Sequence, residues 1–178
     1  MQFVAVEVPL GSIAPPGARK RTASVASGAA IDTASVGPKT FTVDATDRAG
    51  NAATPVTVRH TVAYPFRGFL QPVDNLPTAN TVKAGSVVPV KFGLGGNRGL
   101  NILAAGSPRV SAVPCDGSAP ADEIEQTVTA GGSSLSYDAA SDTYSSIWKT
   151  DRSWAGTCRQ LNVVLADGLP HLATFKFR

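Results

Sequence analysis

The sequence is poor in the residues on which most enzymes depend. It contains two histidines and two cysteines, and its one methionine is the first residue. Charged residues make up 16% of the chain, below the roughly 25% of an average globular protein. No Gly-x-Ser-x-Gly elbow, His-Glu-x-x-His pair or P-loop occurs. These absences disfavour hydrolase and nucleotide chemistry, and we expect a protein without catalytic activity or cofactor.

The two histidines offer little support for acid–base catalysis. His60 lies in the apolar row of an expected strand, so we predict a partly buried, hydrogen-bonded side chain rather than a general base. His171 follows the turn residues Leu169 and Pro170 and is expected to face solvent. A hydrolase is therefore only a distant third possibility.

Long hydrophobic runs and a concentrated basic surface are both missing. No run approaches the roughly 20 apolar residues that cross a bilayer. The apolar start contains Glu7 and has no preceding positive residue, so it does not fit a signal peptide, and we expect an export signal upstream. Of the net charge of +3, Arg19, Lys20 and Arg21 against Glu7 supply +2. We interpret this as a solvated basic run and expect no nucleic-acid partner.

The two cysteines, Cys115 and Cys158, are far apart and belong to neither a Cys-x-x-Cys pair nor a zinc-like cluster. The favoured interpretation is one disulfide, which would stabilise the fold by about 4 kcal/mol on the chain-entropy model. That bond implies an oxidising compartment, hence an extracellular or cell-surface location. Two buried free thiols and a catalytic thiol are the alternatives.

Glycine, proline and small or β-branched residues dominate what is present, which predicts an all-β protein. Residues 40–47 alternate as a strand with Phe41, Val43 and Ala45 on one face, and residues 54–64 return after a turn at 47–51. Apolar or aromatic residues share one face of the returning strand: Val56, Val58, His60 and Val62. Residues 22–27 alternate weakly, and 28–36 are expected to form a short strand and a turn.

The clearest strand pattern covers residues 87–94. One face carries Val88, Val90, Phe92 and Leu94, and the other carries Val87, Pro89 and Lys91. Because proline cannot donate a ladder hydrogen bond, we predict an edge strand or a neighbouring bulge. Val90 and Phe92 are expected in the core, whereas Pro89 and Lys91 would discourage sheet-to-sheet association.

Short strands separated by Gly, Pro and Asp turns continue to the C-terminus. We expect a short or edge strand at 109–115, a polar strand at 123–129 and strands at 134–137 and 143–150 around an Asp-rich turn. Residues 159–165 and 172–177 form a final hairpin with Leu161, Val163 and Leu165 on one face. The pattern predicts a β-sandwich.

Acidic residues gather at three places without a strong metal or catalytic pattern. Asp122, Glu123 and Glu125 lie on the polar strand, and Asp138 and Asp142 lie at a turn, where carboxylates are ordinarily solvated or capping rather than a glycosidase pair. We expect no metal. The weak calcium candidates are Asp44, Asp47 and Asn51. Turn hydrogen bonding explains these residues as well.

Three aromatic residues are the candidate ligand-facing positions. Tyr144 and Trp148 share a strand face, and Trp154 lies in the following loop. They could stack on a sugar, since an aromatic ring offers apolar contact with a polar handle. Alternatively, Trp148 packs beside the disulfide in the core and Trp154 covers its edge.

Residues 22–64 resemble part of a known family. Residues 28–33, 37–43 and 45–51 are similar to the C-terminal half of a bacterial immunoglobulin-like domain, which occurs in tandem repeats in secreted actinobacterial proteins. A complete sandwich has about 7 strands, and this segment supplies three or four. We therefore expect an incomplete unit, with its first strands missing or supplied elsewhere, in a sequence that is a fragment or has an unnatural start.

The second unit resembles the PxKF domain, named for the motif that stands here as Pro89, Val90, Lys91 and Phe92. Further similar stretches are residues 72–75, 81–85, 134–138, 148–150, 154–159 and 175–177. The resemblance implies a β-sandwich-like module near the C-terminus of secreted multidomain proteins.

Together these features predict tandem immunoglobulin-like β-sandwich units. Residues 1–21 form a tail with one strand and a disordered connector, 22–66 a partial bacterial immunoglobulin-like domain and 67–178 a PxKF-like domain. We expect a non-catalytic spacer or accessory module of a larger secreted or cell-surface protein, partnered by the other domains of that protein. The alternative is a carbohydrate- or cell-wall-binding module that recognises polysaccharide through the three aromatic residues.

Overall fold

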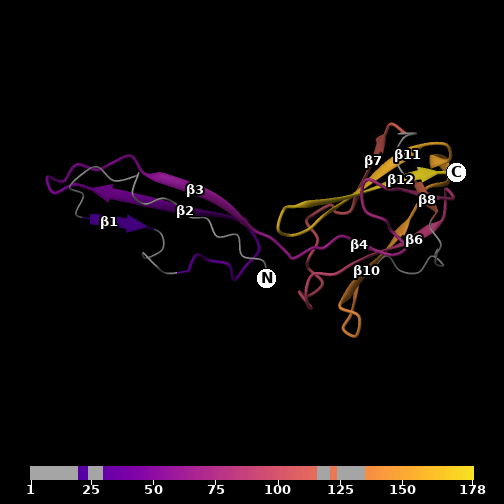
Figure 1. The fold of residues 1–178 in the computed structure, drawn as a ribbon, viewed down its shortest axis with the longest axis horizontal. Helices are drawn as coiled ribbons and strands as arrows, with labels where there is room; N and C mark the ends of the chain where they lie inside the picture. Colours follow the sequence, from indigo (N-terminus) through magenta and orange to yellow (C-terminus); the bar gives the residue numbers. More distant parts are fainter. Residues whose placement is uncertain (1–19, 24–29, 116–120, 124–134) are drawn as a thin grey trace. The chain divides into compact units, whose positions relative to one another are not determined.

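The computed structural model describes residues 20–23, 30–115, 121–123 and 135–178 (Figure 1). These residues form β-strands and one 3₁₀ turn, η1 (Arg152–Trp154), with no α-helix among them. The all-β prediction is therefore confirmed. The chain divides into two compact units, residues 2–63 and 64–178. The strand expected at 4–8, part of the connector at 13–21 and most of the polar strand at 123–129 lie outside the described residues.

The first unit contains a three-stranded antiparallel sheet in the order β1 (Lys20–Ala23), β2 (Gly37–Thr46) and β3 (Val56–Val62). Opposed residues of β2 and β3, such as Phe41 and Val58, place the predicted apolar rows on one face. Lys20 belongs to β1 and not to a connector, because its backbone pairs with Thr46. Residues 30–36 form a bend rather than the expected short strand.

The second unit is built from two sheets. One has the order β4 (Phe69–Leu70), β6 (Val87–Phe92), β10 (Thr143–Lys149) and β9 (Ser136–Asp138). The other has the order β7 (Arg109–Val113), β11 (Cys158–Val164), β12 (Pro170–Phe177), β5 (Ala79–Val82) and β8 (Ala121–Glu123). Its strand β5 pairs in parallel with β12 and β8, while β7 lies at the edge as expected.

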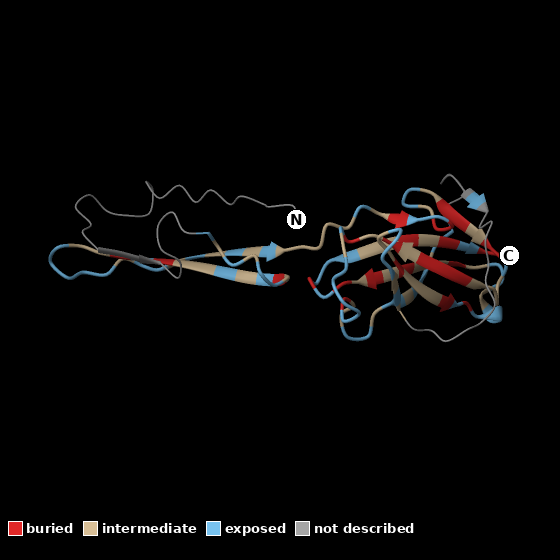
Figure 2. Ribbon diagram, turned by 90° about the horizontal axis from the view of Figure 1, so that it is seen from below, coloured by how far each residue is buried: buried red, intermediate tan, exposed pale blue. Residues whose placement is uncertain are grey.

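One hydrophobic core joins the two sheets of the second unit. Phe92 from β6, Leu161 from β11 and Phe175 from β12 are at most 1% exposed and belong to the same cluster. Buried positions alternate along the second half of β12, at Ala173, Phe175 and Phe177. Figure 2 colours the buried residues red. The predicted core positions Val90 and Phe92 are confirmed, because period-two alternation directs both toward the opposite sheet.

Strand β6 is not the predicted edge strand. It lies between β10 and β4, although β4 pairs only with Phe92 and Lys91. Pro89 lies beyond this pairing and opposite Ile147 of β10, so its missing N–H removes no bond to β4. Pro89 is also buried rather than turned to solvent, while Lys91 is half-buried. The face of β6 that carries Pro89 and Lys91 is thus more buried than alternation alone predicted.

Candidate functional site

The predicted disulfide between Cys115 and Cys158 is present, with an S–S distance of 1.99 Å. Cys158 begins β11 and pairs with Val113, the last residue of the edge strand β7. The bond therefore fastens the end of an edge strand to its neighbour in the same sheet. With both sulfurs bonded, neither cysteine is a free thiol or a nucleophile.

Two of the three candidate aromatic residues belong to the core. Tyr144 is fully buried and Trp148 is 8% exposed, because the face of β10 that carries them is turned toward the other sheet. The Trp148 ring packs edge-on against Phe175 at 4.8 Å between ring centres and also contacts Phe177. Neither ring offers a face on which a sugar could stack.

The third aromatic residue, Trp154, is half-buried in η1. Its ring centre lies 6.0 Å from that of Trp148, with the planes inclined by 39°, and the Arg159 guanidinium lies 5.2 Å above the ring. This cation–π contact already covers part of Trp154. The buried Arg159 Nε has no hydrogen-bond partner in the part of the chain that the structure describes. Trp154 packs against the core, as the second predicted arrangement has it, while the position of Trp148 beside the disulfide stays a prediction.

A polar cluster closes the opposite end of the same sheet. Asp142, at a positive φ of 49°, accepts hydrogen bonds from the Gly96 N–H at 2.9 Å and the Tyr137 hydroxyl at 3.0 Å. Partial burial, followed by the bond to Asp142, raises the pKa of Tyr137. The Arg98 N–H donates to the Tyr144 hydroxyl. Gly96 lies in the glycine-rich turn at residues 93–99. Because the Asp142 carboxylate already accepts from the Gly96 N–H, this N–H is not open to an anion, and the turn is fixed in place by Asp142.

A buried carboxylate anchors the segment that begins the second unit. Asp167, 1% exposed, accepts hydrogen bonds from the Tyr64 N–H at 2.8 Å and the Leu169 N–H at 2.9 Å. Burial, followed by the Asp167 charge, raises the pKa of Tyr64. Asp167 therefore ties the first residue of the second unit to the turn between β11 and β12.

The prediction that His171 faces solvent is wrong. Its ring stacks on Phe66 at 3.7 Å between ring centres, and its buried Nε2 has no hydrogen-bond partner among the described residues. Burial lowers the pKa of His171, an effect that the Asp167 charge partly offsets. The turn at Leu169 and Pro170 gave no indication that Phe66, more than one hundred positions earlier, would cover the His171 ring. His171 is held as an apolar packing group.

Two of the three weak calcium candidates, Asp47 and Asn51, form a turn. Asp47 accepts hydrogen bonds from the Ala49 and Asn51 N–H groups at 2.8 and 2.9 Å and from the Asn51 side-chain amide. These bonds, the Asn51 side chain first, lower the pKa of Asp47. Asp44 lies in β2, where its backbone pairs with Thr22. Among the described residues, no three His, Cys, Asp or Glu side chains form a metal-binding group.

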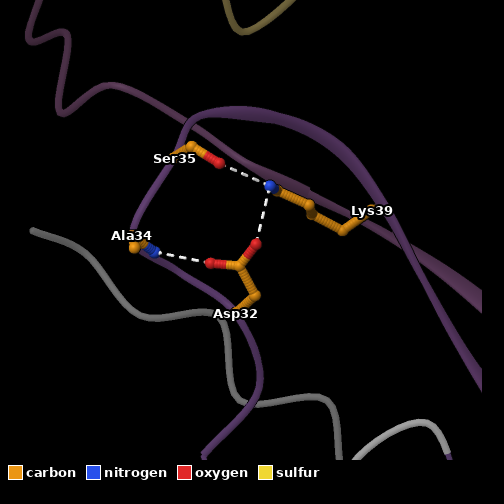
Figure 3. Close-up of polar contacts among 4 residues, drawn as sticks. All are labelled: Asp32, Ala34, Ser35 and Lys39. Carbon is orange, nitrogen blue, oxygen red and sulfur yellow. Dashed lines mark hydrogen bonds and ion pairs between the residues drawn. The ribbon is translucent and has the colours of Figure 1, made fainter.

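An ion pair secures the bend before β2 (Figure 3). The Lys39 ammonium lies 2.9 Å from Asp32 Oδ2 and donates to the Ser35 hydroxyl, while Asp32 Oδ1 accepts from the Ala34 N–H. The bond to Lys39 is the main reason that the pKa of Asp32 is lowered. Because Asp32 is exposed and ionised, this cluster fastens a loop and has no chemistry of its own. Opposite Lys39, His60 is half-buried as expected, but its Nε2 makes no hydrogen bond within the described part of the chain, contrary to the prediction of a hydrogen-bonded ring.

A cavity of about 280 Å³ lies between the two sheets of the second unit. Most of its lining is apolar, and the polar contributors are Ser146 and Lys149 of β10. Alternation along β10 placed Ser146 beside Tyr144 and Trp148. Nothing in the strand pattern indicated that the core would remain open here. This cavity and the Asp167 anchor are the features that sequence analysis missed.

No family model, curated protein or solved structure matches the sequence. Within the described part of the chain, no helix is long and apolar enough to cross a membrane. The geometry of the residues therefore carries the functional argument.

Proposed function

We propose that this chain is a non-catalytic structural module of a larger secreted or cell-surface protein. The observation that carries the proposal is the inward orientation of Tyr144 and Trp148 in the core of a disulfide-linked unit. Residues that a carbohydrate module would present to its ligand are used here for packing. The disulfide supports an oxidising, extracellular location. The partners are the neighbouring domains of the parent protein.

The strand order supports an immunoglobulin-like sandwich for residues 64–178. In constant-type immunoglobulin domains, strands A, B, E and D form one sheet and C, F and G the other. Lettering β4, β6, β7, β9, β10, β11 and β12 from A to G makes the two sheets read A-B-E-D and C-F-G. Strands β5 and β8 are additions beside the last strand. One departure is the disulfide, which joins neighbours in one sheet and not the two sheets.

The PxKF motif fits the role of a folding element within this module. Val90 and Phe92 are in the core, and Pro89 occupies the part of β6 that β4 does not pair with. We propose that residues 64–178 form a PxKF-like domain and that the preceding residues form a partial bacterial immunoglobulin-like domain. The three strands described in the first unit agree in number with the expected partial domain.

Sedimentation with insoluble polysaccharides and purified bacterial cell walls tests this function. A structural module remains in the supernatant at all polymer concentrations. Saturable co-sedimentation that is lost in Trp154→Ala but kept in Leu100→Ala would instead establish the carbohydrate-binding alternative. Leu100 is a suitable control because it is 55% exposed and distant in sequence from Tyr144, Trp148 and Trp154. Circular dichroism of both variants verifies that each retains the β-sheet fold.

A further inference from the structure

The cavity between the two sheets has the chemistry of a ligand site rather than of a packing defect. Its walls include Val90 and Phe92 from one sheet and Leu161 and Val163 from the other. All four side chains belong to the hydrophobic core and are at most 3% exposed. The cavity is therefore bounded by core residues of both sheets.

The size of the cavity exceeds that of ordinary packing voids. Its volume of about 280 Å³ is nearly twice that of an engineered cavity of about 150 Å³ that stays dry and binds benzene. It equals the liquid volume of about nine water molecules, each about 30 Å³. Water would find few partners among walls of Val, Leu, Phe and Trp side chains. An apolar ligand of about eight or nine carbon atoms matches this volume.

The shape and charge of the lining further restrict the class of ligand that would fit the cavity. The cavity follows β10 from Ser146 to Lys149, a span of about 10 Å at the rise of a β-strand. Ser146 lies on the same face of β10 as the buried Tyr144 and Trp148, and its hydroxyl makes no hydrogen bond with the described part of the chain. Lys149 also contributes to the lining and is exposed to solvent. It forms no ion pair with the described residues. An elongated apolar space with a solvent-exposed cation in its lining complements a chain that ends in an anion.

We propose that this cavity binds a straight aliphatic carboxylate of about eight carbon atoms, with the chain between the sheets and the carboxylate at Lys149. Burial of the chain supplies the affinity, and the ammonium of Lys149 orients it with its charged end outward. The site is independent of the proposed spacer role. A module with it would hold an acyl chain in addition to connecting domains.

Binding of sodium butanoate, hexanoate and octanoate to the whole chain tests the proposal, at concentrations below micelle formation. The readout is the indole N–H signal of Trp148 in ¹⁵N–¹H spectra, because Trp148 lines the cavity and Trp154 does not. Trp154→Phe identifies which of the two signals belongs to Trp148. We expect saturable one-to-one binding that tightens about fourfold for each added methylene. Affinity levels off once the chain exceeds the cavity.

Two kinds of variant locate the ligand. Val163→Phe fills the cavity from β11, and Ser146→Leu fills it from β10 in case the first variant does not fold. Each weakens octanoate binding by about tenfold or more, since the new side chain takes the space of several methylene groups. Lys149→Gln weakens octanoate by about two- to fivefold and leaves 1-octanol unchanged. Lys176→Gln, an exposed lysine outside the cavity, changes neither ligand.

Several results would overturn the proposal. The absence of any Trp148 shift up to the solubility limit of octanoate excludes the site. Binding that persists in both folded filling variants places the ligand elsewhere. Equal affinities for octanoate and 1-octanol, with no effect of Lys149→Gln, refute the carboxylate assignment.

Discussion

The described parts of the two units both consist of alternating strands but differ in how many side chains they bury. In the first unit, the described buried hydrophobic residues are Val43 and Ala45. In the second unit, the described residues include a continuous core of sixteen buried side chains, most of them from the two sheets, and a disulfide. A single sheet covers its apolar face only when another layer packs on it. The comparison shows that alternation produces a sheet, whereas facing layers produce a stable core.

The largest expected effect is the loss of a core ring. Phe92→Ala lowers the free energy of unfolding of the second unit by about 3–5 kcal/mol, because Phe92 is 1% exposed and packs against Phe66 and Tyr144. Phe41→Ala, at a half-buried position of the first unit, costs about 1–2 kcal/mol. Urea unfolding followed by tryptophan fluorescence, together with hydrogen exchange, measures both. Equal losses in the two units would refute the difference between them.

Removal of the disulfide has the next largest effect. Cys115→Ala combined with Cys158→Ala lowers the stability of the second unit by up to about 4 kcal/mol, because the bond closes a loop with a sequence separation of 43. Hydrogen exchange at β7 rises most, since the bond fastens that edge strand to β11. Exchange in β2 and β3 of the first unit serves as the internal control. A thiol titration that finds two free cysteines in the non-reduced chain would contradict the premise.

A smaller effect is expected at the buried Asp167. Asp167→Ala leaves the Tyr64 and Leu169 N–H groups without their acceptor and costs about 1–3 kcal/mol. Asp167→Asn gives an intermediate loss, because one amide oxygen replaces two carboxylate oxygens as acceptor. Chemical denaturation gives the magnitude, and exchange at the Tyr64 amide gives the location. Unchanged exchange at that amide in Asp167→Ala would show that the anchor contributes nothing.

The smallest effect concerns pH. The folded pKa of His171 lies below its ordinary value of 6.5 because burial disfavours the charged ring. Between these two values the unfolded chain binds more protons than the folded chain, so stability rises with pH. This stability is fully present above about pH 6.5 and is lost as the pH falls toward the folded pKa. Denaturation at several pH values should show this slope in the wild type and not in His171→Phe. An equal slope in both proteins would rule out His171 as its source.

Much of the fold could be read from local patterns. The alternation of Val88, Val90 and Phe92 predicted an inward face, and the Asp47 to Asn51 turn predicted the hairpin between β2 and β3. These predictions succeeded because side-chain direction in a strand and turn geometry depend on neighbouring residues. Burial of Pro89 and of His171 was missed, because each depends on which distant segment covers it.

The candidate site was less accessible to sequence analysis. The aromatic residues of β10 were recognised, but their direction, toward a ligand or into the core, remained open because both faces of the strand carry suitable neighbours. The cavity beside Trp148 and Ser146 depends on how closely the two sheets approach each other. The alternation of side chains along a strand does not predict the distance between two sheets.

The amino-acid sequence by itself determined the strands, their turns and their inward faces, since period-two alternation and turn chemistry act over a few residues. The tertiary structure decided which strands became neighbours, including the parallel insertion of β5 between β12 and β8. It also brought Asp142 to Gly96 across 46 positions and Asp167 to Tyr64 across 103 positions. Contacts at such separations follow from the packing of whole sheets around a shared core, which local sequence does not specify.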